Sequence, residues 1–335
     1  MKPELRAQIQ AGLAERYTLE RDLGRGGMAS VVLARELQHD RLVALKVLHP
    51  ELAPTIGADR FKREIRVAAR LQHPNILSVL DSGDVGTQLW FTMPFVEGEN
   101  VYERLQKIQQ FAPDDAIRIA TASAEALAYA HAQGVVHRDI KPDNILLSGD
   151  QILVADFGVA RAVSEVAEKL TATGMIVGTP TYMSPEQASG DKAIDGRSDI
   201  FALGCVLYEM LAAEPPFKGP NPQATLMRRF MGPPRPLRPV IMIPEHVEAA
   251  IMRALAKDPA ERYATADAFA DALNGKIPAA APAPSVADAT RTGADRTGGR
   301  ADGQTGGKKG CVGVIMLVAG IGTLLAMAAS ALLAG

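Results

Sequence analysis

The sequence predicts an α+β domain of two lobes, a small β-rich lobe followed by a larger, mainly helical one. In the first part of the chain, short apolar runs are separated by turn residues, which is typical of strands. After Gly98 the apolar residues recur at helical spacing instead. We therefore expect the lobes to meet near residues 95–98, and we expect the domain to occupy residues 17–277.

The individual elements follow from apolar spacing and from residues that start or stop a helix. In the small lobe, Phe61 and Ile65 share one face of a helix that Pro74 stops. In the large lobe, a long helix opens at Pro113 and ends at Gly134, since glycine readily takes the left-handed conformation of a helix end. Strands are expected at residues 17–23, 30–35, 42–48, 76–80 and 89–93. Further helices are expected at residues 197–211, 221–230, 244–256 and 265–274.

Charge, cysteine content and the amino-terminal residues exclude several classes of protein. The chain has 335 residues, with 36 Lys and Arg against 38 Asp and Glu, so its charge indicates no nucleic-acid partner. Cys205 and Cys311 lie far apart and form neither a disulfide framework nor a zinc pattern. Residues 1–16 are charged and lack an apolar core, so we interpret them as an N-terminal segment and not as a signal peptide.

The carboxy-terminal part of the chain changes character twice. Residues 278–310 are rich in Ala, Pro, Gly and Thr and have little to bury, which predicts a flexible linker. Residues 311–334 carry no charge and would form a helix of roughly 35–39 Å, longer than the ~30 Å core of a bilayer. We therefore expect one transmembrane helix there. Lys308 and Lys309 precede it, which predicts a single-pass protein of the inner membrane with its domain in the cytoplasm. A stripe of small residues also makes a homodimer a candidate assembly: Gly322, Ala326 and Ser330.

A glycine-rich turn at residues 24–31 separates two expected strands. Glycines allow positive φ and let backbone N–H groups approach phosphates closely. A strand and not a helix follows the turn, which argues against a dinucleotide-binding βαβ unit, and no G-x-x-x-x-G-K-[ST] motif is present. A hairpin that covers phosphates and a plain structural turn both remain open.

Lys46 lies on the next expected strand, on the same face as Ala44 and Leu48. An ammonium group on a largely apolar face needs a partner, and Glu64 on the following helix lies near its apolar stripe. We therefore predict a Lys46–Glu64 pair that presents the ammonium to phosphates.

The most polar short segment runs from His137 to Asn144, between apolar residues on both sides. Asp156 follows a second strand-like run, at the start of an Asp-Phe-Gly sequence. The oxygens of an Asn and an Asp at the ends of two short strands are ligands of the hard kind that Mg²⁺ prefers. The pattern therefore predicts a magnesium site formed by Asn144 and Asp156.

In this order the motifs resemble those of the eukaryotic-type protein kinase family, over about residues 17–277. The sequences at 178–180 (Gly-Thr-Pro) and 184–187 (Ser-Pro-Glu-Gln) are similar to those of bacterial membrane-anchored Ser/Thr kinases. The resemblance implies a two-lobed protein kinase fold that uses ATP and Mg²⁺, with Mn²⁺ as the alternative metal. It also implies transfer of the γ-phosphoryl group to Ser and Thr hydroxyls of protein substrates.

The resemblance also implies where ATP binds. Lys46, held by Glu64, would contact the α- and β-phosphates, and Met93 would be the gatekeeper beside the adenine. The residues implied to contact the nucleotide are Leu23, Gly24, Arg25, Gly26, Gly27, Met28, Ala29, Ser30, Val31, Ala44, Lys46, Met93, Pro94, Val96, Asn144 and Asp156.

The chemistry is assigned by the same resemblance. Asp139 would orient the acceptor hydroxyl and accept its proton, and Lys141 would stabilise the transferring phosphoryl group. Asn144 and Asp156 would hold the metal. Lys141 at this spacing resembles Ser/Thr kinases, and Thr179 would line the substrate hydroxyl.

Regulation follows from Arg138, which directly precedes Asp139 as in kinases that need a phosphorylated activation loop. Thr171 and Thr173 lie in that loop, and we hypothesise that they are autophosphorylated and pair with Arg138. Two structural contacts are also expected. Glu186 would pair with Arg262, and Asp199 would brace the catalytic loop.

Two other functions remain as alternatives. A catalytically inactive scaffold at the membrane would be expected to lack Lys46, Asp139 or Asp156, and all three are present. A small-molecule phosphotransferase would share the same acidic residues but would lack the long activation segment that ends at Glu186.

Overall fold

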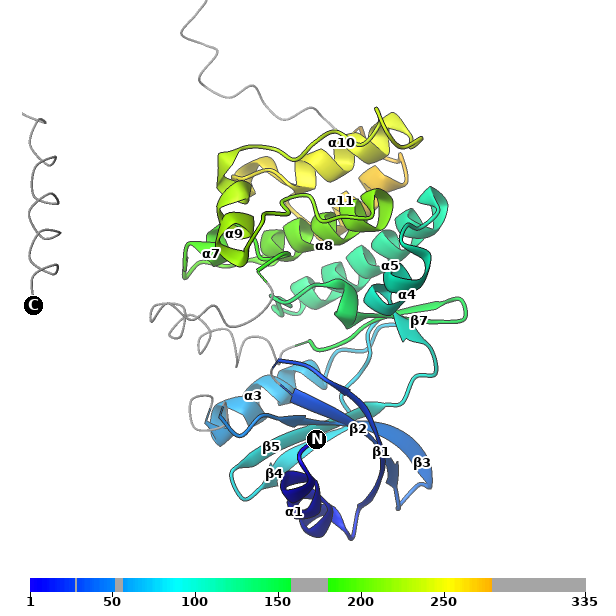
Figure 1. Ribbon diagram of the computed structural model, residues 1–335, viewed down its shortest axis with the longest axis vertical. Coiled ribbons are helices and arrows are strands. Elements are labelled where there is room, and N and C mark those ends of the chain that lie inside the picture. The colour runs from blue at the N-terminus through cyan, green and yellow to red at the C-terminus, as the bar shows by residue number, and fades with distance from the viewer. Residues whose placement is uncertain (28, 52–56, 158–179, 279–335) are drawn as a thin grey trace, which may run out of the picture. The chain divides into compact units, whose positions relative to one another are not determined.

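A five-stranded antiparallel sheet forms most of the small lobe, in the strand order β1-β2-β3-β5-β4 (Figure 1). The computed structural model describes residues 1–27, 29–51, 57–157 and 180–278. The strands are β1 (Tyr17–Arg25), β2 (Ala29–Glu36), β3 (Arg41–Leu48), β4 (Asp81–Val85) and β5 (Gln88–Pro94). Four of the five predicted strands are thereby confirmed to within a few residues.

The two faces of this sheet are covered by different helices. Alternate residues of β3 point to opposite sides, so Val43 and Leu45 join one apolar cluster while Ala44 joins another. The helix α3 (Ala58–Ala68) covers the Ala44 side, where Phe61 is completely buried, as its apolar spacing predicts. The helix α1 (Pro3–Leu13) covers the other side, where Ile9 is completely buried.

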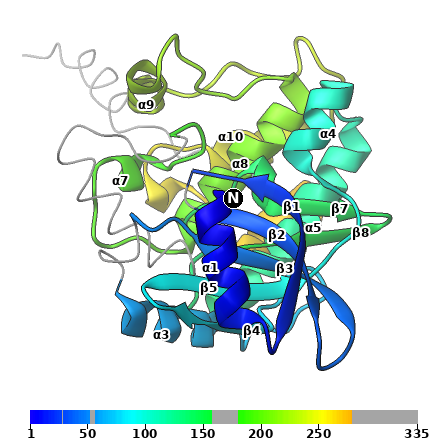
Figure 2. The ribbon, with the colours of Figure 1, turned by 60° about the horizontal axis from the view of Figure 1, so that its bottom comes forward.

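The helix α1 was not predicted from the sequence. Figure 2 shows it lying across the strands. Its apolar stripe is short, with Leu5, Ile9 and Leu13 as the members that reach the sheet. A single short stripe among charged residues is a weak signal, because most of the stability of such a helix comes from tertiary packing. Gln10 adds two hydrogen bonds to the neighbouring strand β1, one to the carbonyl of Tyr17 (3.1 Å) and one from the amide of Leu19 (2.8 Å).

The predicted strand at residues 76–80 is wrong. The first part of the segment bridges to the large lobe, and only its last residue reaches the five-stranded sheet, where the amide of Leu80 donates to the carbonyl of Thr92 in β5 (2.8 Å). The amide of Leu77 donates to the carbonyl of Val154 (2.9 Å), and the amide of Val154 donates to the carbonyl of Asn75 (2.8 Å). The strand that joins the sheet is β4, which begins after this bridge.

The large lobe is built around two long helices that pack against each other, α5 (Pro113–Ala132) and α8 (Gly196–Ala212). As predicted, α5 ends before Gly134, whose φ is +74°. The amide of Val135 then donates to the carbonyl of Ala130 (2.9 Å), which closes the helix end. The remaining helices are α4 (Val101–Ile108), η1 (Pro142–Asn144), α7 (Pro185–Ala188), α9 (Pro222–Met231), α10 (Glu245–Ala254), η2 (Pro259–Glu261) and α11 (Ala266–Leu273).

A small three-stranded sheet lies in the large lobe at the connection between the lobes. Its strands are β6 (Glu99–Asn100), β7 (Ile145–Ser148) and β8 (Gln151–Val154). Gly98 precedes β6, and a Cβ atom at this position would lie 2.1 Å from the carbonyl oxygen of Leu147. Only glycine therefore allows the connection to pass so close to β7. The predicted two-lobed α+β architecture is confirmed.

The predicted linker at 278–310 and membrane helix at 311–334 lie outside the described residues, apart from Pro278. Within the residues that are described, no helix has the length and apolar character needed to span a bilayer.

Candidate active site

The loop from His137 to Asn144 is held in place by a buried carboxylate from α8. Asp199 is completely buried and accepts hydrogen bonds from the amides of His137 (2.8 Å) and Arg138 (2.7 Å). Nε2 of His131 on α5 lies 2.8 Å from the same carboxylate. Arg138 can therefore adopt a φ of +67°, which a non-glycine residue rarely takes without such support. The predicted bracing role of Asp199 is confirmed.

His137 links this loop to the segment that carries Asp156. Its Nε2 donates to the carbonyl of Ala155 (2.8 Å), and its Nδ1 accepts a hydrogen bond from the amide of Asp139 (3.2 Å). These two contacts place the proton of the neutral ring on Nε2. The ring also packs edge-on against Phe157, with 4.7 Å between the centroids.

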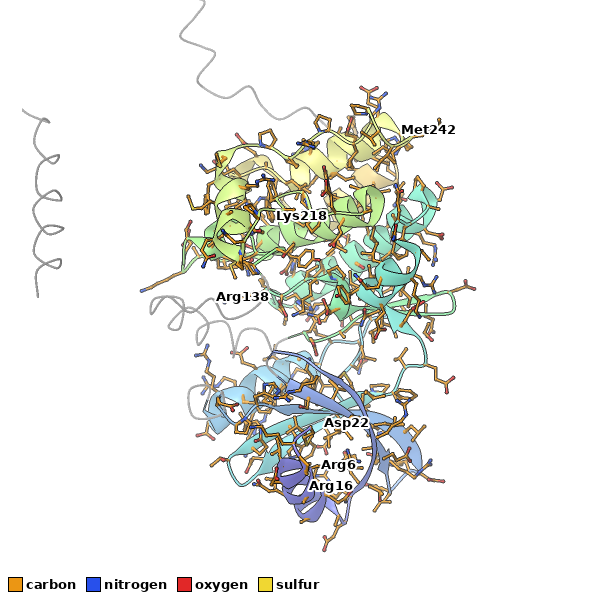
Figure 3. The ribbon with its side chains drawn as sticks, viewed as in Figure 1. Arg6, Arg16, Asp22, Arg138, Lys218 and Met242 are labelled. Atoms are coloured by element: carbon orange, nitrogen blue, oxygen red, sulfur yellow. The ribbon has the colours of Figure 1, made fainter. Side chains whose placement is uncertain are left out.

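Asp139 carries the carboxylate at the centre of the loop. Its Oδ2 accepts a hydrogen bond from Nζ of Lys141 (2.6 Å), and its backbone carbonyl accepts one from Nδ2 of Asn144 (2.7 Å). Burial opposes the charge of Lys141, but the Asp139 carboxylate outweighs this effect and raises the pKa of Lys141. The Asp139 side chain keeps 40% of its surface exposed, so a hydroxyl group can reach it from solvent. Figure 3 marks the place of Arg138, the preceding residue, at the end of the large lobe that faces the small lobe.

Strand pairing brings Asn144 and Asp156 together. Ile145 of β7 faces Val154 of β8, and just beyond this pair the amide of Ala155 donates to the carbonyl of Asn144 (2.9 Å). Asp156 is the next residue, and its φ of +71° marks a turn away from the strand.

The free oxygens of Asn144 and Asp156 suit a hard metal ion. Oδ1 of Asp156 is buried and accepts no hydrogen bond from the residues that the structure describes. Burial opposes the charge of Asp156, but Lys46 outweighs it and lowers the pKa of this carboxyl group. Nδ2 of Asn144 is engaged by Asp139, which leaves the amide oxygen for another ligand. A buried, ionised carboxylate with an unused oxygen is what a Mg²⁺ site requires.

Lys46 extends from β3 to Asp156, whose Oδ2 it contacts. Its Nζ also lies 6.0 Å from the centre of the Phe91 ring. The predicted pair of Lys46 with Glu64 stays a prediction. Glu64 lies half-buried on α3.

Most of the apolar residues predicted to contact the nucleotide belong to one cluster. Of these predicted residues, Ala29, Ala44 and Met93 are buried in the cluster, and Leu23, Val31 and Val96 are partly buried against it. The large lobe adds Leu146, Leu153 and Ala155 to the same cluster, which the sequence analysis did not name. Leu146 is partly buried and lies two residues after Asn144. The spacing of Leu146 from Asn144 is the sequence signal that could have identified it.

The glycine turn is described except for Met28. Gly24 and Arg25 end β1, while Ser30 lies in β2, and the amide of Gly26 donates to the carbonyl of Ala29 (2.9 Å). Pro94 ends β5. Four predicted site residues lie outside the described residues, namely Met28, Thr171, Thr173 and Thr179.

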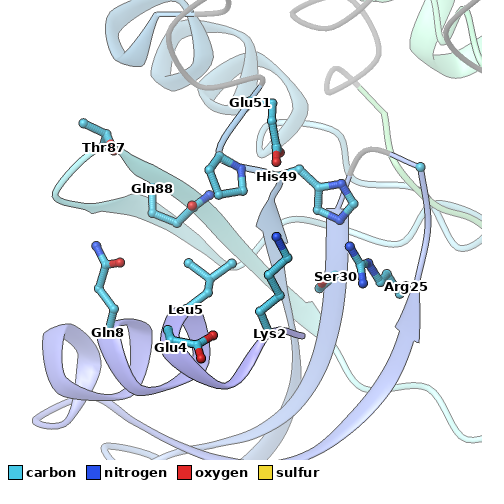
Figure 4. A pocket seen from close by; sticks show the side chains of 12 residues that line it. Lys2, Glu4, Leu5, Gln8, Arg25, Ser30, His49, Glu51, Thr87 and Gln88 are labelled. Carbon is cyan, nitrogen blue, oxygen red and sulfur yellow. The ribbon is translucent and has the colours of Figure 1, made fainter.

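A separate cavity of about 540 Å³ lies between α1 and the glycine turn (Figure 4). Its lining combines the basic Lys2 and Arg25 with the acidic Glu4 and Glu51. The balanced charge indicates no class of ligand, and the lining does not include Asp139, Asn144 or Asp156.

A further residue, Gln187, ties the end of the activation segment to the catalytic loop. Its Nε2 donates to the carbonyl of Arg138 (2.9 Å), and its Oε1 accepts from the amide of Ser184 (3.0 Å). In the sequence, Gln187 stands out only as the last residue of the Ser-Pro-Glu-Gln motif. The adjacent Glu186 binds Arg262 through two hydrogen bonds, which confirms the predicted ion pair.

Comparison with known proteins agrees with this geometry. The chain is 41% identical over 291 residues to the serine/threonine-protein kinase PknB of Mycolicibacterium smegmatis, covering 84% of this chain and 46% of the relative. It is 40% identical over 264 residues to PknB of Mycobacterium tuberculosis, covering 76% and 42%. It is also 40% identical over 265 residues to a probable serine/threonine-protein kinase of Streptomyces coelicolor, covering 76% and 39%. The chain thus spans less than half the length of these curated relatives.

The family model for the protein kinase domain matches residues 17–273, which is most of the chain. This span includes the loop from His137 to Asn144, the neighbouring Asp156 and the apolar cluster formed by residues of both lobes. The chain belongs to the protein kinase domain family.

Proposed function

We propose that the chain is a serine/threonine protein kinase that transfers the γ-phosphoryl group of ATP to hydroxyl groups of proteins. The proposal rests on the arrangement of Asp139, Asn144 and Asp156. The Asp139 carboxylate is partly exposed to solvent, and the Asp156 carboxylate is buried with one oxygen that accepts no hydrogen bond from the described residues. The relatives named as serine/threonine kinases support the class of acceptor.

These residues have separate roles in the proposed reaction. The acceptor hydroxyl oxygen forms a bond to the γ-phosphorus as the bond from that phosphorus to the bridging oxygen of ADP breaks. Asp139 orients the hydroxyl group and takes its proton, while Lys141, 2.6 Å from Asp139, neutralises charge on the moving phosphoryl group. Asn144 and Asp156 would hold Mg²⁺, which neutralises phosphate charge when bound. Lys46 would contact the α- and β-phosphates.

The purified chain, incubated with labelled ATP and Mg²⁺, tests the proposal. We expect label on a Ser/Thr peptide or on the chain itself, and we expect Asp139→Asn to lower the rate by about 10²–10⁴-fold, the usual worth of a positioned base. Asp150→Asn, an exposed turn residue, is the matched control. Equal inactivity of all three proteins would favour the scaffold. Transfer to an aminoglycoside-type alcohol but to no peptide would favour the small-molecule phosphotransferase.

We propose that Thr171 and Thr173 are autophosphorylated and that the phosphate pairs with Arg138. Within the described part of the chain, Nε of Arg138 is buried without a hydrogen-bond partner, so it can donate to a phosphate oxygen. Phosphopeptide mapping of the protein after incubation with ATP should find both sites. Undiminished transfer by the double variant Thr171→Ala/Thr173→Ala would contradict the role.

We propose that residues 311–334 anchor the chain in the inner membrane with the kinase domain in the cytoplasm. The support is the uncharged run itself and the two lysines that precede it, Lys308 and Lys309. After alkaline carbonate extraction, the full chain should stay with the membranes, and a chain that stops at residue 310 should be released. Release of both would contradict the anchor. A homodimer packed through the small-residue stripe of this helix is the candidate assembly.

A further inference from the structure

Arg229 is a buried arginine without a carboxylate partner. It lies on α9 and exposes only 1% of its surface. Burying an unpaired charge costs several kcal/mol unless other groups compensate. Arg262, which is buried to a similar degree, has the carboxylate of Glu186. No acidic group within the described part of the chain forms an ion pair with Arg229, and its burial lowers the pKa of the guanidinium.

Carbonyl oxygens take the place of a carboxylate. Nε of Arg229 donates to the carbonyl of Leu226 (3.2 Å), and Nη2 donates to that of Thr225 (3.4 Å), both on α9 itself. Nη2 also contacts the carbonyl of Pro180. Nη1 is buried and has no acceptor among the described residues. Pro180 is therefore the one acceptor of this guanidinium outside its own helix, among the described residues.

Pro180 begins the described end of the activation segment, directly after Thr179. Other contacts hold this end against the large lobe. Tyr182 donates to Glu209 of α8 (2.6 Å), and Gln187 donates to the carbonyl of Arg138 (2.9 Å). The helix α7, which follows, packs against α9. The contact of Arg229 lies at the start of this segment, nearest to the residue predicted to face the acceptor hydroxyl.

We propose that Arg229 is a positioning residue for the protein substrate. It holds the carbonyl of Pro180 and thereby fixes residues 180–184, the surface on which the acceptor segment of a substrate lies. The inference rests on the proposed kinase function. Arg229 lies on a helix of the large lobe, and its printed hydrogen bonds within the described part of the chain reach Leu226, Thr225 and Pro180, none of them predicted to bind the nucleotide, so it acts on substrate binding and not on ATP binding.

Steady-state kinetics with a Ser/Thr peptide test this role, using the full chain. Arg229→Gln should raise KM for the peptide by about tenfold, the loss expected for a hydrogen bond from a charged group. KM for ATP should stay within about twofold of its original value, because the apolar nucleotide cluster does not include α9. Arg229→Lys keeps the positive charge, but an ammonium group cannot bond several carbonyl oxygens at once as the planar guanidinium does. The peptide KM of Arg229→Lys should therefore lie between those of the original chain and Arg229→Gln.

Arg228→Gln is the matched control, since this neighbouring arginine is exposed and contacts the carbonyl of Lys218. It should leave both KM values unchanged. If Arg229→Gln does not fold, Arg229→Lys decides the question by the same comparison of the two KM values.

Two results would overturn the role of Arg229. One is a peptide KM that stays unchanged in a folded variant, and the other is a rise of both KM values together. Neither would touch the proposed kinase function, because the original chain would still transfer phosphate to the peptide. If the original chain transfers none, it is the kinase proposal that fails.

Discussion

Arg262 and Glu186 are joined by two hydrogen bonds of 2.7 Å, one to each carboxylate oxygen. The Arg262 side chain is completely buried. Its remaining donors reach the carbonyls of Ala256 (2.8 Å), Arg197 (3.0 Å) and Lys257 (3.1 Å). Every guanidinium donor therefore has an acceptor. The pair fastens the end of the activation segment to the segment between α10 and α11.

Removing one partner of this pair should be costly. Glu186→Gln leaves a fully buried guanidinium without its counter-charge, so we expect the free energy of unfolding to fall by about 3–5 kcal/mol. Urea denaturation monitored by circular dichroism measures it. Glu214→Gln is the control, because Glu214 is more than half exposed and lies 3.8 Å from Lys218. A loss as small as that of the control would contradict the prediction.

The same pair predicts a dependence of stability on pH. Burial opposes the charge of Glu186, but Arg262 and Ser198 outweigh it, so the pKa of this carboxyl group is lowered. The unfolded chain therefore binds the proton more readily than the folded one. The stabilisation is complete above the ordinary Glu pKa of about 4.3, and it is lost as the pH falls through the lowered pKa. Urea titrations from about pH 7 to about pH 3 should show the difference between the protein and Glu186→Gln shrinking with acid. A difference that does not change over this range would be evidence against the assignment.

Asp156 should be essential for metal-dependent transfer. Asp156→Asn removes the charge of the carboxylate whose Oδ1 is unused, so we expect the transfer rate to fall by at least about a hundredfold. The Mg²⁺ concentration for half-maximal rate should rise in any residual activity. A Mg²⁺ titration of the transfer assay measures both quantities, with Asp150→Asn as control. An Asp156→Asn variant with an unaltered Mg²⁺ titration would exclude Asp156 as a ligand.

The contact between α1 and the sheet should be worth a measurable part of the stability. Ile9→Ala removes a completely buried side chain, so we expect a loss of about 2–5 kcal/mol in the free energy of unfolding. Gln8→Ala, on the exposed side of the same helix, should change it by less than about 0.5 kcal/mol. If the two variants were equally stable, α1 would not be packed as described.

Much of the fold and of the site could be predicted because local signals agree with the tertiary structure. The apolar run at residues 42–48 predicts β3, and the polar run from His137 to Asn144 predicts a reactive loop. The prediction failed where backbone bonds are made to distant partners. Leu77 bonds to Val154, and nothing in its own neighbourhood indicates that.

Arg229 illustrates the same limit for side chains. In the sequence Arg228-Arg229 is typical of a solvated helix face, yet one side chain contacts Lys218 at the surface and the other is enclosed. Which of two neighbouring arginines is buried depends on the rotation of α9 against the rest of the large lobe. Local spacing does not determine that rotation.

The helix α1 covers the face of the five-stranded sheet that carries Val43 and Leu45, and this has a practical consequence for fragment design. The family match begins at Tyr17, and a fragment cut there would lack α1. Without α1, an apolar surface that includes Val43, Leu45 and Trp90 would be exposed, although all three are buried in the structure. Exposed apolar patches of this kind promote aggregation. A recombinant catalytic fragment intended for crystallisation or inhibitor screening should therefore include the residues before Tyr17.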